Sequence, residues 1–426
     1  MHISNPMQLL TTKAATSMTV LLLMQLATST LGTNTTTPRI IDLSQDIPLD
    51  IGAIISSPGA RAIQQAASQD PLVRAAIVLE HGDIVSSYHR DDVDPNETMF
   101  EVYSTTKSWV SLIIGMLVED GLISLNETLG GIFPNDDAWA DVTDGSTDFR
   151  KNVTIEEMLT MTSGLISSSA DPFGFANCFG GCSLEDSLSV PDIGVKGEFS
   201  YLAASQIPSY IILERSGMTP RQYLEKNVMG KLGIGGDDYD WQQNDDGIEA
   251  GYHGLLLTPM QMAKFGQLYL QGGRTNPSND ERVISQEWID ASFTQYAMED
   301  ALGLPYGYLF WGMGSAYCAI GMGAQDICVD RALGRVAIQQ RDLDWGSMDD
   351  MQGLEHLVVT SVALNGTLSF RASDDGILGI SSTQPKDDEE ESVSLSETDT
   401  NDDVQLVATS VWLVLSLTIS VLVAVC

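Results

Sequence analysis

The two ends of this chain carry apolar segments that do not belong to a globular core, and they confine any fold to the residues between them. Near the first end, residues 18–27 are mostly apolar, follow one early strong cation at Lys13, and precede a run of small residues. This order predicts a secretory signal peptide over residues 1–32. A buried N-terminal helix is the alternative.

At the other end, residues 404–426 contain no charged side chain, and an acidic linker rich in Ser and Thr occupies residues 379–403 before them. The apolar run is long enough to cross a bilayer. Because no Lys or Arg follows it, it favours a glycolipid-anchor signal, with a single transmembrane helix as the alternative. In either case the protein is expected on the extracellular face of the plasma membrane, held there by a lipid anchor or by a single-pass helix.

The charge balance excludes one class of partner. The chain has 58 Asp and Glu against 21 Lys and Arg, a formal net charge of -37. Nucleic-acid binding needs clustered cations, so no nucleic-acid partner is expected. Five Asn-x-Ser/Thr sequons are compatible with glycosylation along a secretory route. They begin at Asn34, Asn96, Asn126, Asn152 and Asn365.

Four of the five cysteines form two close pairs, Cys178 with Cys182 and Cys318 with Cys328. Such pairs suit local disulfides in an oxidising compartment. If residues 321–325 form the tip of a hairpin, the second pair lies directly opposite on neighbouring strands. Buried free thiols are the alternative in each place, and since no His lies near either pair, no metal site is expected.

Residues 33–378 show no tandem repeat and predict one compact domain. Strand-like segments lie near both ends of it, with helical spacing between them. This order predicts an α+β fold in which an antiparallel sheet from the N- and C-terminal segments is flanked by helices, with an inserted helical region. The expected strands are 75–80, 84–88, 306–311, 317–320, 327–329 and 336–339, and the expected helices are 104–120, 154–161, 207–215, 259–270 and one near 354–364.

The chemical signal lies at the start of the first long helix, where Ser104 precedes Lys107 by three positions. On a helix, positions i and i+3 share a face, so the amine of Lys107 is expected to reach the hydroxyl of Ser104. A neighbouring base activates a serine hydroxyl, and a partly buried lysine is such a base. An N-capping Ser followed by an exposed Lys is the alternative.

Together with later segments, this motif resembles the serine β-lactamase and penicillin-binding-protein superfamily, and in particular its class C β-lactamase-related esterases and amide hydrolases. The resemblance implies the β-lactamase/transpeptidase-like fold and an acyl-enzyme mechanism without a cofactor. The matched segments are 100–108, 153–165, 199–201, 254–270, 306–308 and 319–325.

The resemblance also implies roles for individual residues. Ser104 is the expected nucleophile, Lys107 its base and Tyr201 a second proton-transfer residue, although a Tyr in such a place also occurs as a packing residue. The backbone N–H groups of Ser104 and Met322 are the expected oxyanion hole. His253 and Trp241 are candidates that also read as parts of ordinary surface loops. The candidate substrate-binding residues are Tyr103, Trp241, His253, Gly321, Gly323 and Gln325.

Two motifs depart from the family pattern. The second reads Tyr201-Leu202-Ala203, without the Asn that often holds the substrate, and the third reads Ala319-Ile320-Gly321, without a cation for a substrate carboxylate. An unpaired carboxylate in a partly closed site is costly. We therefore expect a secreted, membrane-tethered serine hydrolase that acts on an uncharged small-molecule ester or amide. The alternative is a catalytically silent binding or adhesion ectodomain that keeps the fold.

Overall fold

The computed structural model describes residues 38–134, 139, 149–166, 182–188, 192–201, 206–299, 303–343, 358–366 and 368. The expected signal peptide, the acidic linker and the hydrophobic tail lie outside these residues, as do Asn34, Cys178 and Ala203. Within the described ranges, no helix combines the length and the hydropathy that a membrane span requires.

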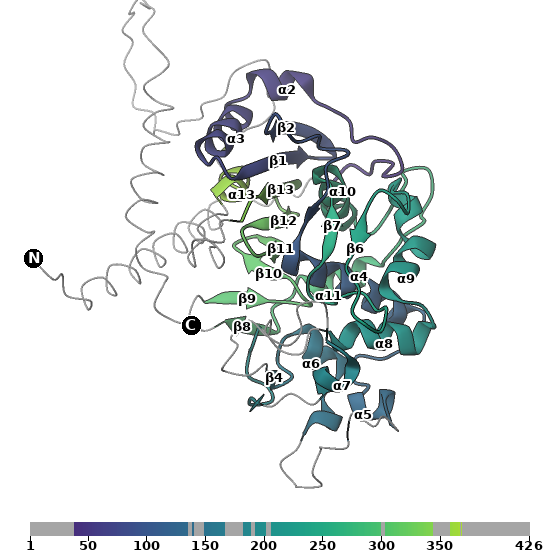
Figure 1. Cartoon of the computed structure of the whole chain (residues 1–426). Helices are drawn as coiled ribbons and strands as arrows, with labels where there is room; N and C mark the ends of the chain where they lie inside the picture. The colour runs from purple at the N-terminus through teal and green to yellow at the C-terminus, as the bar shows by residue number, and fades with distance from the viewer. Residues whose placement is uncertain are drawn as a thin grey trace, which may run out of the picture.

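An eight-stranded antiparallel sheet forms the centre of the molecule, in the order β2-β1-β13-β12-β11-β10-β9-β8 (Figure 1). The first strand, β1, pairs with the last, β13, and β2 lies on its other side, so the expectation of a sheet built from N- and C-terminal segments is confirmed. The strands are β1 (Val73–Glu80), β2 (Asp83–His89), β8 (Ala297–Glu299), β9 (Leu304–Tyr306), β10 (Trp311–Met313), β11 (Ala316–Gly321), β12 (Gln325–Asp330) and β13 (Arg335–Arg341).

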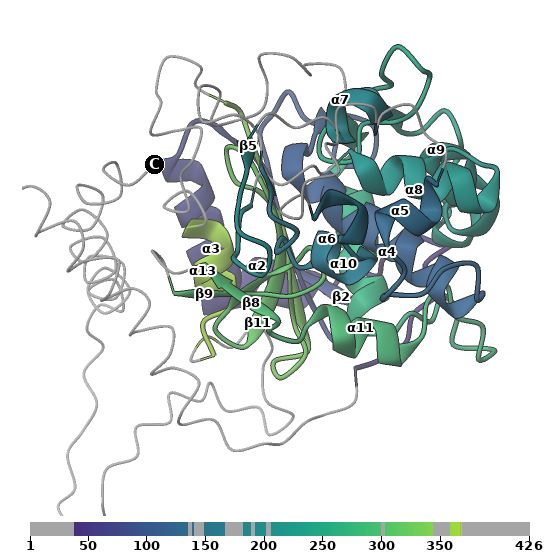
Figure 2. The same ribbon diagram turned by 90° about the horizontal axis from the view of Figure 1, so that it is seen from below.

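Both faces of this sheet are covered, as the alternation of side chains along β1 shows. Ala76 and Val78 belong to a small apolar cluster with α3 (Pro58–Gln69) and α13 (Val358–Ala363), whereas Ile77 and Leu79 belong to the main core. Successive residues of a strand point to opposite faces, so β1 serves both layers. Figure 2 shows the sheet between α3 and α13 on one side and α10 (Pro259–Leu270) and α4 (Thr106–Glu119) on the other.

The helical region between the strand groups matches the predicted segments closely. Helix α10 spans the predicted residues, and its start is fixed because Pro259 occupies the first turn and Thr258 forms a capping box with Gln261. The other helices are α2 (Ile51–Ser56), α5 (Leu129–Ile132), α6 (Ile155–Leu159), α7 (Leu184–Leu188), α8 (Ile207–Ser216), α9 (Pro220–Asn227) and α11 (Gln286–Ser292), with 3-10 turns η1 (Tyr103–Thr105), η3 (Arg150–Asn152) and η4 (Met229–Leu232).

Two small sheets complete the structure. The three-stranded one has the order β3-β7-β6 and lies beside the start of α4. Its strands are β3 (Phe100–Glu101), β6 (Asp240–Trp241) and β7 (Leu255–Leu257), and the two-stranded sheet pairs β4 (Leu165–Ile166) with β5 (Asp192–Ile193).

One expected strand is wrong. The run 306–311 is not continuous, because β9 ends at Tyr306 and the chain turns before β10. Gly307 packs so closely on the carbonyl of Ser292 that an added Cβ would lie 2.0 Å from it. Leu309 adopts a φ of 62°, which an extended strand does not allow.

The three described cysteines are all disulfide-bonded. Cys318 and Cys328 form a disulfide between directly opposed positions of β11 and β12, the pairing that their spacing predicts. Cys182 is disulfide-bonded.

Of the sequon residues, Asn96, Asn126 and Asn152 are exposed and Asn365 is half-buried.

Candidate active site

The site is centred on a sharp turn that joins β3 to α4. The amide of Val102 donates to the carbonyl of Leu255 at 2.9 Å and extends the β3–β7 pairing to the edge of the turn. Tyr103 then adopts a φ of 46°, an uncommon conformation for a residue with a side chain. The turn leaves Ser104 partly exposed at the N-terminal end of α4, where backbone N–H groups favour negative charge.

The side chain of Lys107 lies one helical turn beyond Ser104. Its Nζ atom is 2.8 Å from Ser104 Oγ and 3.4 Å from the carbonyl oxygen of Tyr252. Lys107 is only 5% exposed, and burial lowers its pKa to about 7. The contact expected from the i, i+3 spacing is therefore present, and a large fraction of the amine is neutral at physiological pH.

Tyr201 comes from the helical region and meets the same hydroxyl. Its phenol forms hydrogen bonds with Ser104 and with the side chain of Trp311. Burial raises the pKa of Tyr201, and these two hydrogen bonds oppose the rise. Lys107 Nζ lies 4.8 Å from the centre of the Tyr201 ring. The structure thus brings together the three residues that the resemblance assigns to proton transfer.

Trp311 is a site residue that the sequence reading missed. It lies at the start of β10, and its ring centroid is 5.0 Å from that of Tyr201. The only sequence signal was an aromatic residue in an expected strand, which resembles any other core position. Trp311 lies beside Tyr201 because the chain turns after β9, whereas the sequence pattern predicts a continuous strand there.

The hairpin between β11 and β12 brings Gly321 and Met322 to the turn at Ser104. A Cβ added at Gly321 would lie 2.2 Å from the carbonyl oxygen of Val102, so only glycine allows this approach. Met322 follows at the hairpin tip and is partly exposed. The N–H of Met322, the expected second donor of the oxyanion hole, therefore belongs to a segment that directly contacts the turn carrying Ser104.

Two of the expected substrate-binding side chains have structural roles instead. Trp241 is 2% exposed within the main core, and its indole N–H donates to the carbonyl of Ala250 at 2.9 Å. Gln325 is 1% exposed, and its side-chain oxygen accepts from the Arg341 amide at 3.1 Å. Both side chains hold backbone in place because their polar atoms are engaged inside the protein.

The remaining candidates lie on the turn itself, beside its first strand and at the hairpin tip. His253 is buried, with its Nδ1 atom 3.4 Å from Glu101 Oε1. Gly323 packs against Leu343 at the hairpin tip with a φ of 73°. Tyr103 is partly exposed beside Ser104. These three remain candidates for contact with a substrate.

Ala319 occupies the position where the related motif carries a cation. It lies opposite Ile327 in the ladder, is buried, and belongs to the same core cluster as α4. The alanine offers no charge to a substrate carboxylate. Across the part of the chain that the structure describes, no group of three or more His, Cys, Asp or Glu side chains is arranged to hold a metal ion.

The sequence of the chain matches one known protein family. Residues 61–339 match the Beta-lactamase family. No curated protein matches the chain.

Three solved structures with related folds differ widely in sequence from this chain. EstCE1, a hydrolase with promiscuous acyltransferase activity, has 14% identity and a TM-score of 0.58 over 72% of this chain and 98% of its own. Simvastatin synthase (LovD) from Aspergillus terreus has 16% identity and a TM-score of 0.53, over 73% and 98%. A penicillin-binding protein homologue from Caulobacter crescentus has 15% identity and a TM-score of 0.52, over 67% and 91%. At these identities the likeness shows a shared fold.

Proposed function

Because the chain belongs to the Beta-lactamase family, whose members are serine hydrolases of this fold, we propose that it cleaves an ester or amide bond through an acyl-enzyme on Ser104. The observation that carries this proposal is the 2.8 Å contact between Ser104 Oγ and the buried amine of Lys107. A lysine with a pKa of about 7 accepts a proton at neutral pH, which an exposed lysine does not.

The reaction proceeds in two halves. Ser104 Oγ attacks the substrate carbonyl while Lys107 or Tyr201 accepts its proton, and the backbone N–H groups of Ser104 and Met322 hold the oxyanion. The leaving group departs with a proton, which gives the acyl-enzyme. Water then attacks the acyl carbon, its proton returns through the same groups, and free Ser104 is restored.

We propose a small neutral acyl ester or amide as the substrate class. Ala319 supplies no cation for a substrate carboxylate, and the chain as a whole is strongly acidic. EstCE1, named as a hydrolase with acyltransferase activity, has a related fold and is compatible with acyl-group chemistry here.

We also propose that the mature protein is secreted and tethered to the outer face of the plasma membrane. The apolar ends of the sequence support this location. The disulfide between Cys318 and Cys328 suits an oxidising compartment, and exposed sequons at Asn96 and Asn126 are open to glycosylation.

A fluorophosphonate probe, which forms an adduct with activated serines, tests the catalytic proposal. We expect labelling of the folded protein and hydrolysis of p-nitrophenyl acetate, both lost in Ser104→Ala. Ser108→Ala is a matched control, because Ser108 is a buried serine on the same helix whose hydroxyl donates to the Leu309 carbonyl at 2.7 Å. Absence of both labelling and hydrolysis in folded parent protein would favour the silent ectodomain.

A further inference from the structure

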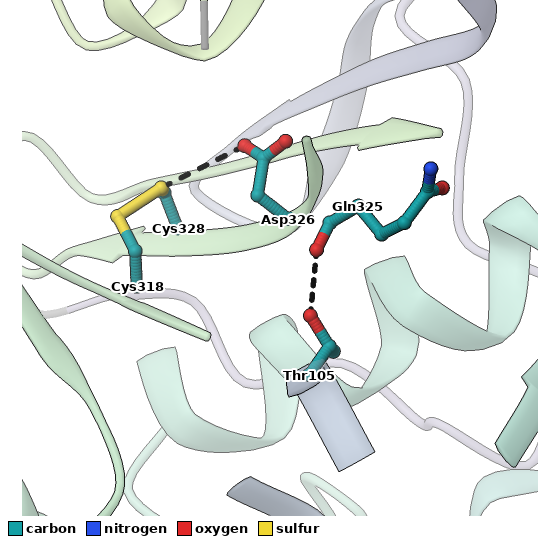
Figure 3. The surroundings of a disulfide bond; sticks show 5 residues. All are labelled: Thr105, Cys318, Gln325, Asp326 and Cys328. Carbon is teal, nitrogen blue, oxygen red and sulfur yellow. Dashed lines mark hydrogen bonds between the residues drawn. A yellow bond between two sulfur atoms is a disulfide. The ribbon is translucent and has the colours of Figure 1, made fainter. Parts of the chain in front are cut away.

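Thr105, the residue after the candidate nucleophile, uses its hydroxyl in an unusual way for its position. It is the N-cap residue of α4, and a threonine there commonly accepts from a free backbone N–H of the first turn. Here no such side-chain cap is formed. Instead the fully buried hydroxyl donates to the carbonyl oxygen of Gln325 at 2.6 Å, across 220 positions of sequence (Figure 3).

A second contact joins the same two segments. The carbonyl oxygen of Val102 accepts the amide of Thr105 at 3.1 Å and also lies against Gly321, where a Cβ would approach it to 2.2 Å. Val102 and Thr105 therefore bracket Ser104 on one segment, and Gly321 and Gln325 bracket the hairpin tip on the other. The turn and the tip are docked at two points, one on each side of the residues that carry the backbone donors.

The hairpin tip is also held from its other side. The Gln339 side chain donates to the Ala324 carbonyl at 3.3 Å, and the Gln325 side chain engages the backbone of Arg341. In Figure 3 the Gln325 side chain extends away from Thr105 while its carbonyl faces the threonine hydroxyl. The tip is therefore joined to β13 as one unit, and the contacts of Thr105 and Val102 with Gln325 and Gly321 join that unit to the start of α4.

We propose that Thr105 is a positioning residue that sets the spacing between the backbone N–H groups of Ser104 and Met322. This inference rests on the proposed function, because it concerns the oxyanion hole of the acyl-transfer reaction. The hydroxyl of Thr105 is fully buried and donates to the Gln325 carbonyl, so it does not take part in the chemical step directly. It acts by fixing the Gln325 carbonyl, and with it the tip that carries Met322, against the start of α4.

The proposal predicts a specific kinetic effect. Thr105→Val keeps the shape of the side chain and removes the hydroxyl, so the donors lose their alignment for the transition state. Misplacing a catalytic group by about 1 Å costs up to roughly 10²-fold, and deleting one oxyanion donor costs about 10²- to 10³-fold. We expect kcat for p-nitrophenyl acetate to fall about 10- to 100-fold while KM changes by less than about threefold.

Two variants separate this role from ordinary destabilisation. Thr105→Ser restores the hydroxyl, and we expect it to recover most of the parental kcat. Ser111→Ala removes another buried hydroxyl of α4, one that donates to the Tyr308 carbonyl at 2.8 Å and not to the hairpin tip. It should lower thermal stability and leave kcat near the parental value. Should Thr105→Val not fold, Thr105→Ala replaces it at a temperature where circular dichroism shows native structure.

Hydrogen exchange of the backbone amides at residues 321–325 provides the second readout. Faster exchange in Thr105→Val but not in Thr105→Ser, together with the kcat loss, supports the proposal. Parental kcat in Thr105→Val overturns it, as does an equal loss in Thr105→Ser. If the parent itself neither hydrolyses esters nor reacts with the fluorophosphonate, the proposed function fails and the positioning role with it. In that case exchange at the tip still reports whether the docking contact exists.

Discussion

The amine of Lys107 lies 2.8 Å from the hydroxyl of Ser104, and burial alone lowers its pKa to about 7. Below that pH the amine is protonated and cannot accept a proton, and above it the neutral form predominates. We therefore expect kcat/KM for p-nitrophenyl acetate to rise with pH through a single ionisation near 7. Lys107→Ala should remove this dependence and lower the rate by about 10²- to 10⁴-fold. Hydrolysis at the parental rate in this variant would contradict the assignment of the base.

Tyr201→Phe tests the second proton-transfer residue. The substitution keeps the ring beside Trp311 and near Lys107 but removes the hydroxyl that meets Ser104. We expect kcat to fall by about 10²-fold, the lower range for a positioned acid or base. The thermal midpoint serves as the control for packing. An unchanged kcat would show that Tyr201 only packs against its aromatic neighbours.

The alanine at position 319 predicts substrate preference. A charge-assisted hydrogen bond to a substrate carboxylate is worth roughly 1.5 to 3 kcal/mol, and its absence should weaken binding of anionic substrates by about one to two orders of magnitude. We expect kcat/KM for short neutral esters to exceed that for penicillins and cephalosporins. Steady-state kinetics on both classes give the answer, and cephalosporin turnover equal to or faster than ester turnover would restore the lactamase reading.

The two apolar ends give a prediction about processing. The mature protein should begin between residues 28 and 33 and should leave membranes on treatment with a phosphatidylinositol-specific phospholipase. N-terminal sequencing and release assays measure both. Detection of residues 404–426 in the intact mass of the membrane-bound protein would replace the lipid anchor with a transmembrane helix.

The disulfide between β11 and β12 should contribute to stability. It closes a short loop, with a sequence separation of 10. In the chain-entropy account, such a loop contributes about 2 to 3 kcal/mol to the free energy of unfolding. We expect the double variant Cys318→Ala/Cys328→Ala to lose this amount in urea titrations. Reducing agent should then act on the double variant only through the remaining disulfide of Cys182. A double variant as stable as the parent would show that packing alone holds the hairpin.

Local spacing predicted much of the fold and the centre of the site. The i, i+3 relation brings Lys107 to Ser104 because both lie on one regular helix, or on the turn leading into it. The opposition of Cys318 and Cys328 follows equally from the period of a hairpin. In each case one repeating geometry connects residues that are close in sequence.

The parts that the sequence did not predict depend on tertiary contacts. Thr105 reaches Gln325 through a backbone carbonyl, which every residue possesses and which therefore leaves no signature in the sequence. Trp311 approaches Tyr201 only because the chain turns between β9 and β10. Trp241 was a candidate substrate-binding residue but lies in the core. An aromatic residue in an acidic segment gives the same sequence pattern whether it lies on the surface or in the core.

The pairing of β1 with β13 imposes an order on events during synthesis. Glu80 and Arg335 are partners in the ladder and are separated by 255 positions in the sequence. Ribosomes synthesise about 5 to 20 residues per second, so β13 is made roughly 13 to 51 s after β1. Until then the inner edge of β1 has unpaired backbone groups, a surface prone to association with other chains. A nascent chain of this protein therefore needs protection during that interval, and the site around Ser104 cannot be complete before nearly the whole domain has been made.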